Sequence, residues 1–591
     1  MSKLKTSEVS RRRFLGNTAV ASAVGLGLTG NAMAQEGAVP SRFSGLTPLR
    51  PAPSAQESNA PVTPPPLAAV VLNKAAFGPR PGDVDAFNAL GGDDIARITA
   101  WVDNQLNPGL SDPDVDTRLA DLLGSSEPDD VNAYDTLDKT PIELWQDYAQ
   151  NDDYSIRNRP VWQVERLTLL RGMYSQWQLR EVLFDFWFNH FNVKGREFPT
   201  YSMMPEFDRI IRSHIFGNFG DMLNAVAKST SMLYYLDNYA NTWPNPNENF
   251  AREVLELHTL GAIENYYGAV DPGSLPDNIH NQRTGYTEID VFQLARALTG
   301  WSVSNTQDDS PDTGEFIFRP ARHYNFSDGP IEVMDINIAV TGGENDVTDI
   351  LDYLAGHYGT AKYVAWKLCT RLVGESPDPA LVGSTADEFY NRRADSDQLQ
   401  QVYRHVLLSP QFQNTWGAKV RRPIETIIRA MRSADVDLTF RIDHSVSNSI
   451  FGRLDDTGQY PFGYDAPTGY PDEKEMWQGS GPLIMSWRTV TYMLRQDSIV
   501  NLAEQTNIGI PVEADRSPSN IVNFWMNRAL GYSLDIAIAN RMTQFITDAL
   551  GGLPDNPINT DSSNISSGST YQRIIRAVVG LVLMSPDAMR R

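Results

Sequence analysis

The sequence has 591 residues, of which 41% are hydrophobic and 10% aromatic, and it carries a formal charge of −23. This composition is typical of a globular protein with a large core, and so negative a surface excludes general binding to nucleic acid or to anionic lipid. Cys369 is the only cysteine, so an intramolecular disulfide and cysteine-rich metal or redox chemistry are excluded.

The first 34 residues have the pattern of a twin-arginine export signal. Arg11 and Arg12 lie in the run Ser-Arg-Arg-Arg-Phe-Leu, a weakly apolar stretch follows from Thr18 to Leu28, and Ala-Met-Ala ends in a cleavage site at Ala34. Such a segment is an address that is removed after export, and about a dozen apolar residues are too few to anchor a protein in a bilayer. We therefore expect the twin-arginine translocase to deliver the protein to the periplasm or the medium.

Beyond this segment, the sequence predicts a linker and one large helical body. Residues 35–66 are rich in proline, serine and alanine, which predicts an extended linker. Because the first 34 residues contribute +4, from five basic side chains and Glu8, residues 35–591 carry −27. Residues 67–591 show mostly helical periodicity, which predicts a mainly α fold built as a single multi-helix body.

Short β pieces and long loops interrupt this helical pattern. Alternation typical of a strand is confined to pieces such as 316–318 and 336–340. Loops rich in Gly, Pro, Asn and Asp are expected at 266–285, 302–346, 442–482 and 551–570. Loops of this length are uncommon as simple connectors and often build sites.

Two helix starts can be located from their capping residues. Residues 245–248 offer Asn245 as a cap, a proline at the first helical position and Glu248 three residues after the cap. Residues 287–290 repeat the pattern with Thr287 and Asp290. Gly261 and Gly300 are expected to end the corresponding helices.

Three ionisable residues are predicted to face the core. His190 lies in the apolar segment 179–193, and Glu253 and His258 share the apolar arc of a second helical segment. A buried carboxylate costs several kcal/mol unless it is paired, so Glu253 is expected to have a partner. Arg252 and Glu256 point away from this arc. Ordinary exposed i,i+4 pairs are expected between Glu248 and Arg252 and between Arg252 and Glu256.

A metal site and a buried polar network are both open interpretations of these residues. His190, Glu253 and His258 are sufficient ligands for zinc or non-haem iron, and His323 in a downstream loop is a fourth candidate. Against this, Glu253 and His258 are five residues apart, about 140° around an α-helix, and the His-Glu-x-x-His motif is absent. The sequence also lacks a hydrolase nucleophile elbow, a phosphate-binding loop and a dinucleotide fingerprint.

Three further segments allow both a functional and a structural interpretation. Lys419, Arg421 and Arg422 precede a proline, where they form either an anion site at a helix start or a solvated basic turn. The loop Gly458–Asp472 interleaves aromatic residues with Pro and Gly, as a stacking surface for sugar or aromatic ligands or as a packed loop. Cys369 lies in an apolar helical segment and is expected to be buried rather than reactive.

Several motifs together resemble the bacterial family called domain of unknown function 1800. They are Leu-Asn-Lys-Ala-Ala-Phe-Gly-Pro at 72–79, Phe-Trp-Phe-Asn-His-Phe at 186–191, the run 247–261 that contains Glu253 and His258, and the run 286–301 that ends in Thr-Gly-Trp. The resemblance covers roughly residues 67–500 and implies a large, helical, exported protein, often encoded beside a second exported family, domain of unknown function 1501. It implies no activity and no catalytic residues.

Two functions are consistent with these observations. The first is an enzyme that acts on a periplasmic or extracellular substrate with a buried His/Glu polar or metal site, whose cofactor would be a transition metal. The second is a noncatalytic binding or assembly partner of another exported protein, such as one of the 1501 family. The first predicts that His190, Glu253 and His258 meet beside a cavity, and the second predicts a wide exposed apolar patch.

Overall fold

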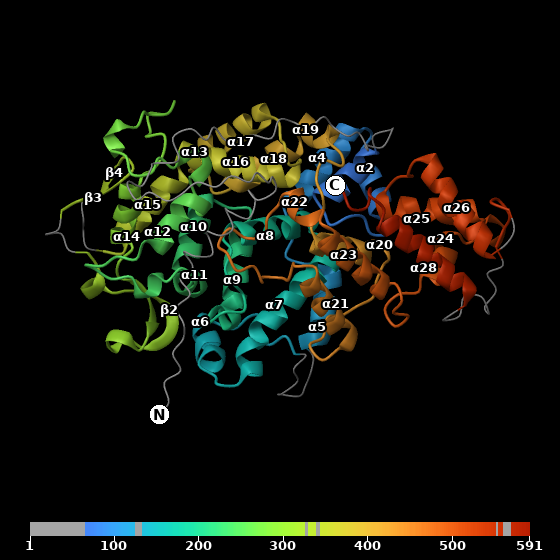
Figure 1. The fold of residues 1–591 in the computed structure, drawn as a ribbon, viewed down its shortest axis with the longest axis horizontal. Coiled ribbons are helices and arrows are strands. Elements are labelled where there is room, and N and C mark those ends of the chain that lie inside the picture. The colour runs from blue at the N-terminus through green and yellow to red at the C-terminus, as the bar shows by residue number, and fades with distance from the viewer. Residues whose placement is uncertain (1–64, 124–132, 325–328, 339–342, 551–552, 559–568) are drawn as a thin grey trace, which may run out of the picture. The chain divides into compact units, whose positions relative to one another are not determined.

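A computed structural model describes residues 65–123, 133–324, 329–338, 343–550, 553–558 and 569–591. The predicted export signal with Arg11, Arg12 and Ala34, and almost all of the predicted linker, lie outside these residues. The described residues form one compact unit. The fold is mainly α, with 59% of the structure helical and only a few short strands, which confirms the fold class predicted from the sequence (Figure 1).

Helices of the first half of the chain supply the elements around the predicted site. Two of them continue into short π-helices, η1 at Leu144–Ala149 and η3 at Val254–His258. The α-helices are α2 Leu67–Lys74, α3 Asp83–Asn88, α4 Asp94–Leu106, α5 Pro113–Leu123, α6 Pro141–Glu143, α7 Tyr154–Tyr174, α8 Gln178–His190, α9 Thr200–His214, α10 Phe219–Lys228, α11 Thr230–Tyr235, α12 Glu248–Glu253, α13 Ala262–Asn265 and α14 Glu288–Ala297.

Helices of the second half pack against them. They are α15 Asn345–Ala355, α16 Tyr358–Leu372, α17 Pro379–Asn391, α18 Gln398–Leu407, α19 Pro410–Asn414, α20 Pro423–Ser433, α21 Ser445–Asp456, α22 Lys474–Trp477, α23 Ser480–Met493, α24 Leu502–Gly509, α25 Pro518–Leu530, α26 Ile536–Leu550 and α28 Thr570–Leu583. The described part of the chain contains no helix that is long and apolar enough to cross a membrane.

The strands form two small antiparallel hairpins. Strand β1 (Trp301–Asn305) pairs with β2 (Asp312–Phe318), and β3 (Ile331–Val333) pairs with β4 (Ile336–Ile338). Both pieces predicted as strands are thus strands, although residues 339–340 of the second lie outside the described residues. The predicted loop 302–346 therefore contains most of the sheet structure.

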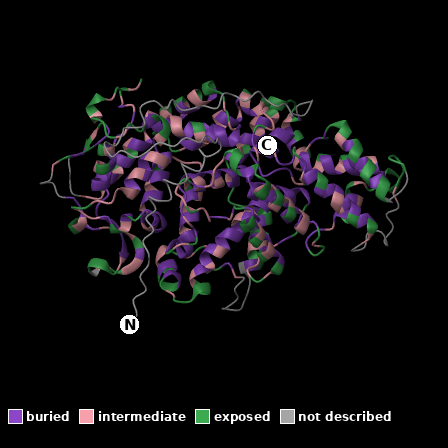
Figure 2. Cartoon of the chain, viewed as in Figure 1, coloured by how far each residue is buried: buried purple, intermediate pink, exposed green. Residues whose placement is uncertain are grey.

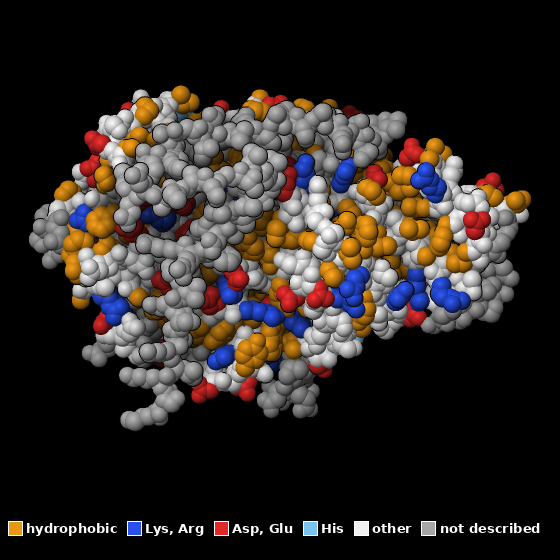
Figure 3. Space-filling view, in the orientation of Figure 1, with side chains coloured by type: hydrophobic (Ala, Val, Ile, Leu, Met, Phe, Trp, Pro, Cys, Tyr) orange, Lys and Arg blue, Asp and Glu red, His pale blue; other side chains and the backbone are white. Residues whose placement is uncertain are grey.

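The core is one extensive cluster of buried hydrophobic side chains with a smaller cluster beside it. Figure 2 shows that the buried residues lie along the helices throughout the interior of the helical body. Trp187 of α8 is fully buried and donates a hydrogen bond of 2.6 Å to the hydroxyl of Tyr403. On the face shown in Figure 3, acidic and basic side chains are interspersed with hydrophobic ones.

Two sequence predictions need correction. Residues 442–482 are not one loop, because Val446, Ile450 and Leu454 form an apolar stripe with four-residue spacing and fold as α21. The cap of α12 is Asn247, whose side chain accepts from the amide of Asn249, and not Asn245. The second predicted start is confirmed, because Thr287 and Asp290 form a capping box on α14.

Candidate functional site

His190 is buried at the C-terminal end of α8, as predicted, and both of its ring nitrogens are hydrogen-bonded. Its Nε2 lies 3.0 Å from the main-chain oxygen of His258, and its Nδ1 lies 3.0 Å from Nζ of Lys367. Because a carbonyl oxygen only accepts, Nε2 carries the proton and Nδ1 accepts from the lysine. Burial lowers the pKa of His190 well below its ordinary value, and Lys367 lowers it further.

Lys367 of α16 is the residue of this network that the sequence analysis missed. Burial lowers the pKa of its ammonium group to about 8, against the opposing effect of Asp472 and Glu473. Its helix was recognised as an apolar segment, and nothing in the local sequence indicates a lysine beside a histidine 177 residues away. The neighbouring Cys369 is fully buried, in agreement with the prediction.

Glu253 directly precedes a short π-helix, His258 is its last residue, and both side chains are buried. The π-helix Val254–His258 changes the geometry assumed for an α-helix, because its i→i+5 repeat brings residues five apart closer to one face. Burial lowers the pKa of His258 to about 3. In the described part of the chain its Nε2 has no hydrogen-bond partner.

The structure corrects the expectation that Glu253 is paired. Among the described residues no side chain donates a hydrogen bond to it or forms an ion pair with it, although only 8% of Glu253 is exposed. Burial instead raises its pKa to about 7, with Glu256 acting in the same direction. The carboxyl group therefore avoids the cost of a buried charge by holding a proton more tightly.

The predicted exposed pairs of Arg252 are present, with Glu248 at 3.2 Å and Glu256 at 3.6 Å. Glu288 of α14 adds a third carboxylate at 2.8 Å.

His323 belongs to a different cluster. Its Nδ1 donates to the main-chain oxygen of Thr299 at 2.6 Å, and its Nε2 lies 3.8 Å from Asp346. It shares neither partner with His190 or His258. Across the described ranges, no group of three or more His, Cys, Asp or Glu side chains is arranged to hold a metal ion. Around His190 the geometry is that of a buried polar network.

The loop Gly458–Asp472 packs onto the end of α8. The amide of Tyr470 donates to the side chain of Asn189 at 3.0 Å, and Asn192 donates to two main-chain oxygens of the loop. Gly469 has φ of +69°, and a Cβ there would lie 2.2 Å from the main-chain oxygen of Asn189. Only glycine allows this approach. The other end of the loop reaches a surface cavity.

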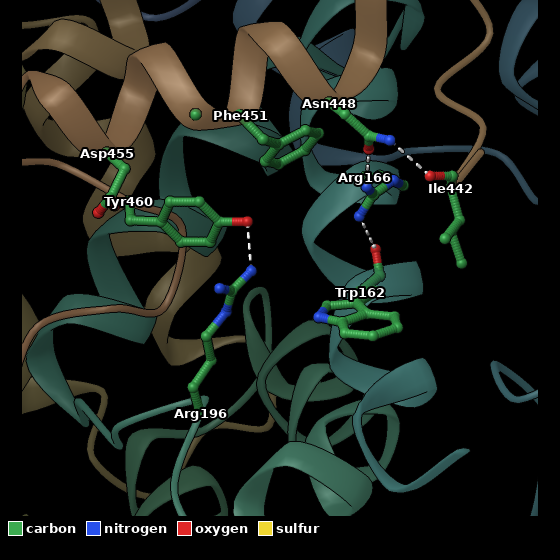
Figure 4. A pocket seen from close by; sticks show the side chains of 9 residues that line it. Trp162, Arg166, Arg196, Ile442, Asn448, Phe451, Asp455 and Tyr460 are labelled. Carbon is green, nitrogen blue, oxygen red and sulfur yellow. Dashed lines mark hydrogen bonds between the residues drawn. The ribbon is translucent and has the colours of Figure 1, made fainter. Parts of the chain in front are cut away.

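That cavity, of about 360 Å³, lies between α7, α21 and the loop, and it is open to solvent. Figure 4 shows aromatic side chains and two arginines around it. Its lining residues come from four separate segments of the chain: Trp162, Arg166, Arg196, Ile442, Asn448, Phe451, Gly452, Asp455 and Tyr460.

Hydrogen bonds hold both arginines of the cavity in place. Arg196 donates from Nε and Nη2 to the two oxygens of Glu165 at 2.9 Å, and its guanidinium lies 4.2 Å from the centre of the Tyr460 ring. Glu165 has no exposed surface, and burial raises its pKa despite Arg196. A bidentate pair of this kind fixes the plane of the guanidinium.

Arg166 is fixed in a similar way. Its Nη2 donates to Asn448 at 2.7 Å, its Nη1 donates to the main-chain oxygen of Trp162 at 3.2 Å, and its guanidinium stacks on Phe451. Its Nε is buried without a hydrogen-bond partner among the described residues. The cavity thus combines apolar ring faces with oriented donors, which are the two requirements of a small-molecule site.

Sequence reasoning found one wall of this cavity and missed the rest. The aromatic content of the loop Gly458–Asp472 indicated a stacking surface, and Tyr460 does line the cavity. The pairing of Arg166 with Asn448 joins residues 282 positions apart. No local pattern signals such a contact.

The described residues form a large, mainly α-helical body with a buried polar network and a cavity that is open to solvent. The chain belongs to the family described as "Protein of unknown function (DUF1800)", whose profile matches residues 70–590. This confirms the family resemblance seen in the sequence motifs. Neither a curated protein nor a solved structure matches the chain.

Proposed function

We propose that this protein binds a sugar, or a sugar-like polyhydroxylated ring, in the cavity between α7 and α21. The observation that carries the proposal is the combination of Trp162, Phe451 and Tyr460 with two arginines whose orientation is fixed by hydrogen bonds. Ring faces stack on the apolar face of a sugar, while oriented guanidinium groups donate to its hydroxyl oxygens.

The charge balance of the cavity favours a neutral ligand over a strongly anionic one. Arg166 and Arg196 contribute two positive charges, and Asp455 on the wall with Glu165 behind it contributes two negative charges. Asp455 supplies an acceptor for a ligand hydroxyl. The volume of about 360 Å³ lies in the range of small-molecule sites and suits one or two sugar rings.

The place where this binding occurs is proposed from the N-terminal sequence. Arg11, Arg12 and the small-residue site at Ala34 support export by the twin-arginine translocase to the periplasm or the medium. Replacing both arginines by lysine should retain the protein in the cytoplasm with its leader attached. Export of the doubly substituted protein at the normal level would contradict this assignment.

Calorimetric titration of the purified protein against a panel of neutral sugars, uronic acids and aromatic carboxylates tests the binding proposal. Trp162→Ala removes one stacking wall and should weaken sugar binding about tenfold, which corresponds to about 1.4 kcal/mol. Trp366→Ala is the matched control, because Trp366 is 40% exposed on α16 and does not line the cavity.

A sugar that binds the unsubstituted protein and the Trp162→Ala protein equally well would contradict the proposal. If only aromatic carboxylates bound, the cavity would still be the binding site, but its ligand would be an aromatic carboxylate and not a sugar.

A second candidate function is assembly with another exported protein, such as one of the 1501 family. It is favoured by large hydrophobic side chains exposed around α13 and the following segment, with Ile263 79% and Ile279 80% exposed. Coexpression and size-exclusion chromatography should then give a complex that Ile263→Asp weakens. A complex unaffected by this substitution would not use the surface around α13.

A further inference from the structure

The basic turn before α20 is buried, contrary to one of its two sequence interpretations. Lys419, Arg421 and Arg422 are 2%, 1% and 2% exposed, so they do not form a solvated turn. A solvated cation is balanced by water and counterions, whereas a buried one must be balanced inside the protein. The partners of these residues therefore decide what the turn does.

Cations outnumber carboxylates in this interior. Glu425 forms ion pairs with Arg371 and Arg591, with N···O distances of 2.9 Å each, and Asp472 pairs with Lys419 at 2.8 Å. Asp185 pairs with Arg371 at 2.9 Å and also with Arg422. Six buried cations surround these three carboxylates, and among the described residues neither Arg421 nor Arg429 forms an ion pair with any of them. The cations are Arg371, Lys419, Arg421, Arg422, Arg429 and Arg591.

Arg421 is the cation whose hydrogen bonds reach no carboxylate. Its Nη2 donates only to neutral oxygens, the main-chain and side-chain oxygens of Asn73, at 3.0 and 2.9 Å. The same side-chain oxygen of Asn73 accepts from Nε of Arg429 at 3.2 Å, so one neutral amide separates two guanidinium groups. Burial lowers the pKa of Arg421 well below its ordinary value, and Arg429 lowers it further.

Two donors of Arg421 have no acceptor among the described residues. Its Nε and Nη1 are buried, and within the described residues neither has a hydrogen-bond partner. Leaving charged donors unsatisfied in the interior carries the full desolvation penalty of each group. A single negative ligand beside Arg421 would accept from these two donors and balance the charge of this guanidinium.

We propose that a small inorganic anion of the size of chloride binds beside Nε and Nη1 of Arg421. The start of α20 does not supply the site, because the amides of Arg422 and Ile424 already donate to Glu425 and Gln459 at 2.9 Å and Pro423 has no N–H. Recognition therefore rests on the guanidinium. A monatomic anion is favoured because the groups around it are at most 2% exposed, which leaves no route for a bulky ligand.

Bromide replaces chloride in such sites and can be located by its anomalous scattering. Crystals of the unmodified protein soaked in sodium bromide should show an anomalous peak within hydrogen-bonding distance of Nε or Nη1 of Arg421. Absence of a peak there, with both nitrogens bonded to water or to protein oxygens, would overturn the proposal. This experiment does not depend on a variant that folds.

Thermal unfolding gives a second test in solution. At constant ionic strength, replacing gluconate by chloride should raise the midpoint temperature of the unmodified protein, because a ligand that binds only the folded state stabilises it. Arg421→Met should abolish this chloride dependence, while the matched control Arg488→Met, on the exposed surface of α23, should retain it. Equal chloride dependence in all three proteins would overturn the proposal.

Discussion

Two neighbouring regions of the interior bury ionisable groups in opposite ways. Around Glu425 the groups keep their charges, because Arg371 and Arg591 outweigh the effect of burial and hold the pKa of this carboxyl well below its ordinary value. Around His190 and Glu253 the groups give up their charges, since burial lowers the pKa of the histidine and raises that of the acid.

The difference between the two regions lies in the supply of partners. Each carboxylate of the ionised region has at least two cations within ion-pair distance, whereas no described side chain pairs with Glu253. Whether a buried ionisable side chain keeps its charge therefore depends on the oppositely charged groups within about 4 Å, and not on its residue type. The following substitutions test this contrast.

Glu425→Gln should have the largest effect. It removes the carboxylate that Arg371 and Arg591 share and leaves both guanidinium groups buried beside a neutral amide. We expect the free energy of unfolding in urea to fall by about 3–5 kcal/mol. Glu513→Gln, at an exposed position, is the control and should change it by less than about 0.5 kcal/mol. A loss below about 1 kcal/mol for Glu425→Gln would mean that the network is not ionised.

His258→Phe tests the neutral region at acid pH. The pKa of His258 is about 3 in the folded protein and near 6.5 when unfolded. Between these values only the unfolded state takes up the proton, so stability falls as pH falls from 6.5 towards 3, by up to about 1.4 kcal/mol per pH unit. The phenylalanine variant should lose this part of the slope in urea titrations.

The histidine prediction has a control on the surface of α18. His405→Phe, at a half-buried position, should leave the slope unchanged. A slope that is the same in all three proteins would contradict the assignment of His258 as a buried neutral group.

Glu253→Gln should have a smaller effect of the opposite sign. The pKa of Glu253 is about 7 when folded and near 4.3 when unfolded. The unfolded state loses its proton first as pH rises, so stability falls between about pH 4.3 and 7. The glutamine mimics the protonated acid and should stabilise the protein by about 1–2 kcal/mol at pH 8, with little change at pH 4.5. Glu264→Gln, at an exposed position on α13, is the control and should change the stability little at either pH. If Glu253→Gln changed the stability equally at pH 4.5 and pH 8, the raised pKa of Glu253 would be contradicted.

The thiol of Cys369 should not react with a thiol reagent in the native protein. It lies on α16 between Lys367 of the neutral region and Arg371 of the ionised one, and burial raises its pKa to about 11. A thiol reagent at pH 8 should leave it unmodified in buffer and label it fully in urea. Rapid labelling in buffer would show that α16 opens and that the two regions are not packed as described.

Much of the fold was predictable because it depends on short-range patterns. The apolar segment 179–193 predicted the burial of His190, the Thr287 and Asp290 capping box predicted a helix start, and 316–318 predicted a strand. Each of these signals lies within a few residues of its effect.

The sites were less predictable because they depend on contacts between distant segments. The turn 419–422 was open to interpretation as solvated because its acids, Asp185 and Asp472, lie in other parts of the chain. The π-turn at Val254–His258 changed the angle between Glu253 and His258, and the α-helical geometry assumed for the sequence could not include it. Glu253 was expected to be paired, although a shifted pKa was a second way to bury it.

The two ends of the fifteen-residue loop from Gly458 to Asp472 differ in how freely their side chains can be replaced. At one end Tyr460 lines the cavity, where a different side chain would change the shape and chemistry of the proposed binding site. At the other end Gly469 touches Asn189 so closely that no side chain fits, and Asp472 joins the ionised interior. Evolution can therefore alter specificity at the first end while the second keeps the loop seated, so relatives with different ligands should differ at 460 and agree at 469.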